Sequence, residues 1–305
     1  MNIRKSTRKI LITAGTAAVL GLALSAERAQ AVPVSDLPDL SLLTPYATFG
    51  NFFNDQNVTI NGNAGIGNNG KLFLESPSSI KGNLDLGIGA TAGGGGYPGN
   101  VGGAITTGVD FTAAQNQVQS ASTSLAGLAA DVTLGAVTTG QTFGAVNGVA
   151  DIFVVNVASI KLGSGQNIAF SGDAGDIFVL NVSGGEDMNG DAAISALGQA
   201  SHVLINLTTT ASLGKVAHIG NVLNGTTIIP DATYAEFHSV NGAIFGGLGE
   251  IKLMSGSKVE SVPFQPPTVP DAGSTMLLMS MGLGCLAAVK RKFVFLISDH
   301  PVLNL

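Results

Sequence analysis

The residues with the clearest potential for chemistry form a short acidic stretch, DMNGD at residues 187–191. Asp, Asn and Asp at alternate positions are typical of the start of a calcium-binding loop, because Ca²⁺ takes oxygen ligands from such side chains. The Gly expected next is Ala192, and Gly198 stands where the final Glu ligand belongs. A calcium site and a polar Gly-rich turn both remain open. The calcium ligands would be Asp187, Asn189 and Asp191, with Glu186 as a further oxygen donor.

The sequence has no recognisable metal-binding His motif and no catalytic motif of a hydrolase. Apart from His300, the chain has three His, namely His202, His218 and His238. Their spacing does not match local metal-ligand patterns such as HExxH, and no GxSxG motif of a serine hydrolase occurs. Asp173 and Asp176, or Asp151, could approach one another, but a glycosidase needs two carboxylates facing each other across a cleft. We therefore expect no enzyme and no cofactor other than calcium.

Charge is distributed unevenly along the chain. The whole sequence has a net charge of −6, from 14 Lys and Arg against 20 Asp and Glu. Between Val32 and Pro270, six Lys and no Arg stand against 17 acidic residues, a net charge of −11. A nucleic-acid-binding protein would present a basic stripe, so we expect no nucleic-acid partner. The single Cys, Cys285, excludes an internal disulfide framework and a thiolate zinc site.

The N-terminus has the order of a secretory signal peptide. Basic residues between Arg4 and Lys9 precede an apolar stretch at residues 10–26, and a small-x-small sequence follows. This order predicts a signal peptide over residues 1–31 and export of the rest. The residues that would form the cleavage site are Ala29, Ala31 and Val32. An amphipathic helix or a retained membrane anchor is the alternative.

The C-terminus contains three segments in a fixed order. Pro-rich residues 265–271 predict an extended linker. The apolar residues 274–289 would form a helix of about 24 Å, slightly short of the ~30 Å hydrocarbon core of a bilayer. A basic cluster then follows, made of Lys290, Arg291 and Lys292, and it would stay cytoplasmic. The pattern predicts a transmembrane helix, and an ordinary single-span anchor is one interpretation.

These C-terminal segments resemble the PEP-CTERM class of bacterial sorting signals, in the variant that reads VPD-small-G. The matching motif is Val269, Pro270, Asp271, Ala272 and Gly273, followed by the apolar helix and the basic cluster. The resemblance covers residues 269–293. It implies a substrate of an exosortase, an inner-membrane intermediate, and release or transfer to the surface of a bacterium that produces exopolysaccharide. The chain departs from the class in its tail, residues 294–305.

Internal repeats predict the fold of the middle of the chain. DIFVVNV at residues 151–157 recurs as DIFVLNV at 176–182, and SHVLINL at 201–207 keeps the pattern. An earlier pair is spaced by 20, INGNAGI at 60–66 and IKGNLDL at 80–86. Short β-branched runs separated by Gly, Asn and Ser are typical of a β-solenoid. We therefore expect a mainly β fold over residues 32–264, an irregular right-handed β-helix in which Asn156, Asn181 and Asn206 form a ladder.

One segment has the period of an α-helix instead. Its apolar residues recur at spacings of three and four, namely Phe111, Ala114, Val118, Ala121, Leu125 and Leu128. This pattern predicts a helix over residues 110–130, about 31 Å long, with Asp110 as its N-cap. The repeat strands are apolar on both faces, for example at Val154 and Val155. We therefore expect the helix to lie along the solenoid axis and to cover the outer face across about six coils.

The middle of the chain also resembles the choice-of-anchor A family of bacterial surface domains and, more distantly, the ice-binding-protein-like β-helix. The resemblance rests on the VDF sequence at residues 109–111, DIFVVNV, and ASHVLINL at residues 200–207. It implies a secreted domain carried on various surface anchors. We therefore predict an exported surface or matrix protein with a structural or adhesive role. Ice binding or another ligand-binding β-helix is the alternative, and a carbohydrate-active enzyme is the third.

Overall fold

The computed structural model describes the protein from residue 34 to residue 266, except for residues 55, 145, 147–149, 189–191, 197–199, 209–215, 220–221, 231–233 and 263. The predicted signal peptide and cleavage site, residues 1–32, lie outside the described residues. So do the sorting signal at 269–293, with its transmembrane helix, and the tail at 294–305. The fold therefore concerns the predicted secreted domain.

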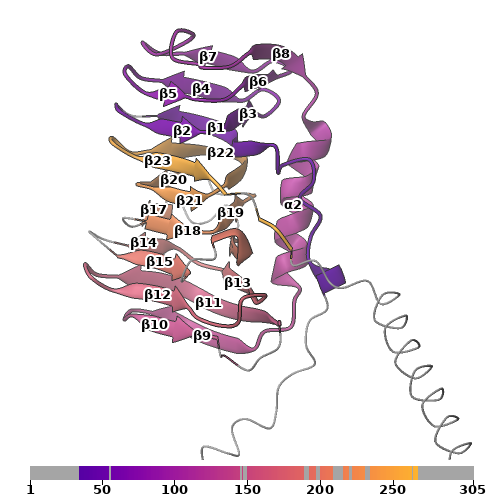
Figure 1. Cartoon of the computed structure of the whole chain (residues 1–305), viewed down its shortest axis with the longest axis vertical. Coiled ribbons are helices and arrows are strands. Elements are labelled where there is room, and N and C mark those ends of the chain that lie inside the picture. The colour runs from indigo at the N-terminus through magenta and orange to yellow at the C-terminus, as the bar shows by residue number, and fades with distance from the viewer. Residues whose placement is uncertain are drawn as a thin grey trace, which may run out of the picture. The chain divides into compact units, whose positions relative to one another are not determined.

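The described strands form two parallel sheets, one of fifteen strands and one of eight. Figure 1 shows the strands stacked in layers, with helix α2 running beside them. Each turn of the chain lays one strand on the equivalent strand of a neighbouring turn, so the prediction of a mainly β, β-helix-like fold with a helix is confirmed. The right-handed sense of the winding stays a prediction.

The strands fall into three ladders. The ladder beside the helix runs in the order β9 (Val132–Val137), β11 (Ile152–Leu162), β13 (Ile177–Val182), β16 (Val203–Leu207), β19 (Thr226–Ile229), β22 (Ile244–Leu253), β1 (Tyr46–Asn54), β3 (Asn63–Ile66), β6 (Leu84–Gly87) and β8 (Ile105–Val109). The long strands β11, β22 and β1 continue into a second ladder with β14 (Glu186–Met188), β17 (Val216–Ile219), β20 (Tyr234–Phe237), β4 (Lys71–Leu74) and β7 (Thr91–Gly93). The eight-stranded sheet runs in the order β10 (Gln141–Phe143), β12 (Asn167–Phe170), β15 (Ala193–Ala196), β18 (Val222–Asn224), β21 (Val240–Gly242), β23 (Lys258–Ser261), β2 (Thr59–Asn61) and β5 (Ser79–Ile80).

The repeats pair in the register that the sequence predicts. Phe153 of β11 lies beside Phe178 of β13, which lies beside Val203 of β16. The earlier pair is in register too, with Ile60 beside Ile80. A repeat spacing of 20 to 25 residues is therefore the length of one coil at these positions.

The order of the coils in space differs from their order in the sequence. Strand β1 lies between β3 and β22, so that Thr48 pairs with Ile244. The first strand, β1, thus lies in the middle of the stack, and the strands that follow it lead outward to β8 at one end. The chain then crosses through α2 to β9 at the other end (Figure 1). The remaining coils then return to β22. The repeats did not reveal this break, because β1 and β22 share no repeated sequence.

Helix α2 spans Thr112–Ala126, 15 residues, and is shorter than the predicted 110–130. At 1.5 Å per residue it is about 22 Å long, the width of four to five strands rather than six coils. It contacts β13, β16, β19 and β22. Asp110 lies one residue before the N-cap, Phe111, but its carboxylate accepts the backbone N–H of Thr112 at 2.9 Å. Asp110 therefore binds the first turn from a position one residue earlier than expected.

The helix covers a second hydrophobic core. One core fills the inside of the coils, with Val155 and Leu180 among its members. The other lies between the wall and the helix, and it contains Val154 and Val179 of the wall and Val118 and Leu125 of α2, all fully buried. The expectation that the helix covers the apolar outer face is confirmed.

Removing one helix side chain from this second core tests how much of the stability depends on it. We expect Leu125→Ala to lower the free energy of unfolding by about 2–5 kcal/mol, because it leaves a cavity against the wall. Ser120→Ala, at an exposed position of the same helix, should change it by less than about 0.5 kcal/mol. Urea denaturation followed by circular dichroism measures both, and equal effects of the two variants would contradict this account of the helix.

Candidate functional site

The structure describes only part of the predicted calcium site. Asp187 lies in β14, half-exposed on the outside of the second ladder, while Asn189 and Asp191 lie outside the described residues. Glu186 points the opposite way, into the core, and only 2% of it is exposed. Successive side chains of a strand alternate between its faces, so Glu186 does not share a cation with Asp187. In the part of the chain that the structure describes, no three His, Cys, Asp or Glu side chains gather as a metal site would require. Calcium binding at Asp187, Asn189 and Asp191 stays a prediction.

Asp176, one of the acidic residues considered for glycoside hydrolysis, has a structural role. Asp176 is almost fully buried, and its two carboxylate oxygens accept the backbone N–H groups of Asp151 at 2.9 Å and Asp173 at 2.7 Å. Its carboxylate therefore connects one coil to the next through backbone hydrogen bonds. His202 lies in a short 3₁₀ helix, Ala200–His202, and His238 follows β20.

The outer face of the eight-stranded sheet is a regular polar surface. Its core-facing positions, such as Ile194, Leu223 and Val259, are fully buried, and the alternate positions face outward. The outward positions form two rows along the stack. We define this outer face by Thr142, Ala169, Ser195, Asn224, Asn241, Glu260 and Asn61 in one row and Asn167, Ala193, Val222, Lys258, Thr59 and Ser79 in the other.

Side-chain hydrogen bonds hold several residues of the outer face in place. Asn241 Nδ2 donates to Asn224 Oδ1 at 3.0 Å, and Asn224 Nδ2 donates to the carbonyl of Ile194 at 3.1 Å. Asn61 Nδ2 donates to Glu260 Oε2 at 2.8 Å. The strand spacing of about 4.8 Å repeats these short polar side chains at fixed intervals. Such a surface suits the recognition of a regular extended partner, and it offers no grouping of acid, base and nucleophile.

A ladder of Asn side chains connects the wall to the helix. Asn156, Asn181 and Asn206 are in register on β11, β13 and β16, as predicted. Asn206 Nδ2 donates to the carbonyl of Ser122 in α2 at 2.9 Å, and Asn181 Nδ2 donates to that of Leu125 at 2.8 Å. The same amides donate along the ladder, from Asn206 to Asn181 at 2.8 Å and from Asn181 to Asn156 at 2.9 Å. The ladder therefore binds the C-terminal half of the helix through polar groups.

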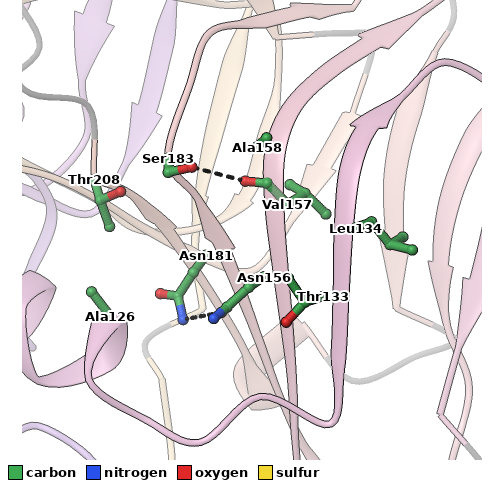
Figure 2. Close-up of a pocket in the computed structure, with 9 residues that line it drawn as sticks. All are labelled: Ala126, Thr133, Leu134, Asn156, Val157, Ala158, Asn181, Ser183 and Thr208. Carbon is green, nitrogen blue, oxygen red and sulfur yellow. Dashed lines mark hydrogen bonds between the residues drawn. The ribbon is translucent and has the colours of Figure 1, made fainter.

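A cavity of about 230 Å³ lies where the ladder passes the end of the helix (Figure 2). Figure 2 shows Asn181 and Asn156 next to each other, with Ala126 at the end of α2 on one side and Thr133 of β9 on the other. The residues that line the cavity are Ala126, Thr133, Leu134, Asn156, Val157, Ala158, Asn181, Ser183 and Thr208. The sequence predicted the Asn ladder, but it gave no sign that the end of the ladder borders a cavity.

Two family models match the chain. The model of the ice-binding-like adhesive domain matches residues 13–248. The model of the VPDSG-CTERM motif matches residues 268–293, which contain the predicted motif Val269–Gly273 and the basic cluster. The predictions of a PEP-CTERM-type sorting signal and of an ice-binding-like domain are thereby confirmed. The closer resemblance to the choice-of-anchor A family stays a prediction.

Two solved structures with a similar fold are ice-binding proteins. One, from the Antarctic ascomycete Antarctomyces psychrotrophicus, has a TM-score of 0.50 and 18% identity, over 74% of this chain and 98% of that protein. Another, from an Antarctic biological consortium, has a TM-score of 0.51 and 17% identity, over 76% and 92%. At this identity the likeness concerns the fold alone. The curated proteins include no match to the chain.

No helix within the described residues is long and apolar enough to cross a membrane. The predicted transmembrane helix at 274–289 is not among those residues, and it stays a prediction.

The buried carboxyl of Glu186 should make the stability of the fold depend on pH. Burial raises the pKa of Glu186 from 4.5 to about 8, and neither of its oxygens has a hydrogen-bond partner in the described structure. Between these two values the folded protein holds a proton that the unfolded chain has lost. The protonated Glu186 carboxyl therefore makes its full contribution to the free energy of unfolding below about pH 4.5. This contribution falls as the pH rises and is lost above about pH 8. The free energy of unfolding falls by at most about 1.4 kcal/mol per pH unit in this range because of Glu186.

Glu186→Gln should remove this dependence, because a neutral amide has no proton to lose in this range. We expect the variant to be more stable than the natural chain at pH 8 and similar to it at pH 4.5. Urea denaturation at both pH values measures the difference, with Asp187→Asn on the outer side of the same strand as the control. A loss of stability with pH that persists unchanged in Glu186→Gln would rule out Glu186 as its source.

Proposed function

The chain belongs to the family of ice-binding-like adhesive domains, and on that premise we propose that it is an exported surface protein that adheres through the outer face of its eight-stranded sheet. The role is non-catalytic and structural or adhesive. The VPDSG-CTERM match supports export and sorting, and the regular polar rows of the outer face are the observation that carries the adhesive role.

In this proposal the two ends of the chain direct its transport. The secretion machinery exports the chain, and the signal peptide is removed after Ala31. The helix at 274–289 then holds an intermediate in the inner membrane, with Lys290, Arg291 and Lys292 on the cytoplasmic side. An exosortase processes the chain at Val269–Gly273, and the domain reaches the cell surface or the extracellular matrix. The N-terminal order of basic residues, apolar stretch and small-x-small sequence supports the first two steps. The C-terminal order of motif, apolar segment and basic cluster supports the later ones.

The outer face suits a polysaccharide partner of the matrix. It carries amide and hydroxyl groups at regular spacing, and Lys258 and Glu260 give it one charge of each sign. Direct attraction to a polyanion is unfavourable, because the body from Val32 to Pro270 has a net charge of −11. Exopolysaccharide that is neutral, or bridged by divalent cations, is therefore the expected surface component.

Ice is the second candidate partner for the same face. The fold is that of solved ice-binding proteins, and flat rows at regular spacing could match an ordered lattice. The outer face has Thr142 and Thr59 but no continuous Thr row, and Thr226 and Thr227 are fully buried. Polar amides and hydroxyls of mixed type favour the polysaccharide.

Processing at the sorting motif can be measured directly on the natural protein. We expect mass spectrometry of the extracellular fraction to find a mature C-terminus near Asp271, because the exosortase separates the domain from its membrane helix. An intact C-terminus at Leu305 in the inner-membrane fraction, with no processed form outside the cell, would indicate a plain anchor instead.

Adhesion through the outer face can be tested with one bulky substitution. Ala169→Tyr places a large side chain within a row, on its second strand, without removing a side-chain hydrogen bond, since Ala has none. We expect it to reduce the attachment of cells that carry the full chain to a surface coated with their own matrix polysaccharide by about tenfold, equivalent to ~1.4 kcal/mol. Attachment is measured by counting retained cells under flow.

The matched control is Ala113→Tyr, at an exposed position of α2 far from the outer face. It should leave attachment unchanged. Equal attachment by all three proteins would exclude the outer face as the adhesive surface. The same variants in a thermal-hysteresis assay test ice: hysteresis that Ala169→Tyr abolishes favours ice over polysaccharide, and ice growth unperturbed by the natural chain removes ice as a partner.

A further inference from the structure

Helix α2 sets the direction of the Asn ladder. The carbonyls of Ser122 and Leu125 can only accept hydrogen bonds, so the NH₂ groups of Asn206 and Asn181 must be the donors to them. Each of these amides uses its second N–H along the ladder, so the donors run from Asn206 through Asn181 to Asn156. The assignment of oxygen and nitrogen in all three side chains follows from the two helix carbonyls.

The ladder ends at Asn156 with donors that have no protein acceptor. Asn156 Oδ1 is used as the acceptor from Asn181, and no hydrogen bond of the described residues uses its NH₂ group. The helix ends at Ala126, so it does not cover this side chain, which is half-buried and lines the cavity. An amide whose oxygen already accepts a hydrogen bond is a stronger donor at its nitrogen. The end of the ladder therefore presents two polarised N–H groups to the cavity.

Hydroxyl groups add acceptors on the same cavity wall. Thr208 Oγ1 donates its proton to the carbonyl of Val182 at 3.1 Å, and Ser183 Oγ donates to that of Val157 at 3.4 Å. Their oxygens then keep lone pairs for a ligand, and the exposed hydroxyl of Thr133 can donate or accept. A ligand that fits must accept hydrogen bonds from Asn156 and donate them to Ser183 or Thr208.

The neutral lining and the small volume of the cavity limit the ligands that it can hold. Every lining residue is neutral, so the cavity offers no ion pair to a phosphate, a carboxylate or an amine. Its volume of about 230 Å³ is that of roughly eight waters at ~30 Å³ each, below the usual range of cavity volumes for drug-sized ligands. A single ring of hydroxyl groups has this size, and each of its hydroxyls both donates and accepts. Ala126 and the exposed Ala158 supply apolar surface for its C–H groups.

We propose that the cavity between Asn156, Thr133 and the end of helix α2 binds one neutral sugar residue of a polysaccharide. This inference rests on the proposed adhesion to matrix polysaccharide and adds a second contact to it, one that recognises a single sugar ring, whereas the outer face recognises an extended array. The Asn156 amide is the principal donor, and Ser183 and Thr208 accept from the sugar hydroxyls.

Nuclear magnetic resonance of the ¹⁵N-labelled mature chain tests the site. The probes are the methyl glycosides of glucose, galactose, mannose, fucose and N-acetylglucosamine, each titrated to roughly 50 mM, above the millimolar range of weak ligands. We expect at least one of them to shift the side-chain amide signals of Asn156 in a saturable manner, together with the backbone signals of Ser183 and Thr208.

Asn156→Asp is the diagnostic variant. An Asp keeps the oxygen that accepts from Asn181, so the ladder stays intact, but it has no N–H to offer. We expect affinity for the responding glycoside to fall about tenfold or more, followed at Ser183 and Thr208. Asn116→Asp, which adds the same charge at an exposed position of α2 outside both the cavity and the outer face, should bind the glycoside as the natural chain does. Thr133→Val, which removes one hydroxyl at nearly constant volume, should weaken binding less than Asn156→Asp.

Two results would overturn the proposal. One is the absence of saturable shifts at Asn156 with all five glycosides, which would indicate that the cavity holds water only. The other is equal binding by Asn156→Asp and the natural chain. The cell-attachment assay separates this failure from failure of the proposed function: attachment that depends on Ala169 while the glycosides leave Asn156 unperturbed keeps adhesion and removes the sugar site.

Discussion

Strands β11, β13 and β16 must bury apolar side chains on both faces, and the rest of the structure depends on how that is achieved. Val155 and Leu180 fill the inside of the coils, while Val154 and Val179 on the same strands point outward and are also fully buried. Left uncovered, the outward set would be an exposed apolar patch of a size that soluble monomers rarely keep. Helix α2 covers it, so the length of the helix sets how many strands can be apolar outside.

Placing the helix there dictates the order of the coils. The chain must leave one end of the stack at β8 and re-enter at β9, which is what a helix along the axis provides. The N-terminal coils then rest on β22, although Thr48 and Ile244 are almost 200 residues apart. Contacts of such separation carry a large entropy cost of loop closure. The repeated strands from β11 to β16 pair locally, so they can form first and give β22 a base on which β1 later pairs.

The strand register and the helix could be predicted from the sequence, because each follows from a local pattern. The 25-residue repeat gave the register of Phe153, Phe178 and Val203, and the 3,4 spacing of Val118 and Leu125 gave the helix and its buried face. The pairing of β1 with β22 could not be predicted, since it joins unlike sequences across the whole domain. The cavity could not be predicted either, because the aligned Asn residues do not show which of them lies beyond the end of the helix.

The two halves of α2 meet different chemistry, and this difference creates the cavity. Near its N-terminus Phe111 packs edge-on against Phe49 with ring centres 5.1 Å apart. Toward the C-terminus the last carbonyls of a helix lack partners within it, and Asn181 binds that of Leu125. Because each Asn of the ladder donates to the next one, the NH₂ group without an acceptor among the described residues is that of the last residue, Asn156 on β11. One more turn of helix, about 5.4 Å, would reach over β11 and cover Asn156, so the helix length that seals the apolar wall also leaves the end of the ladder open.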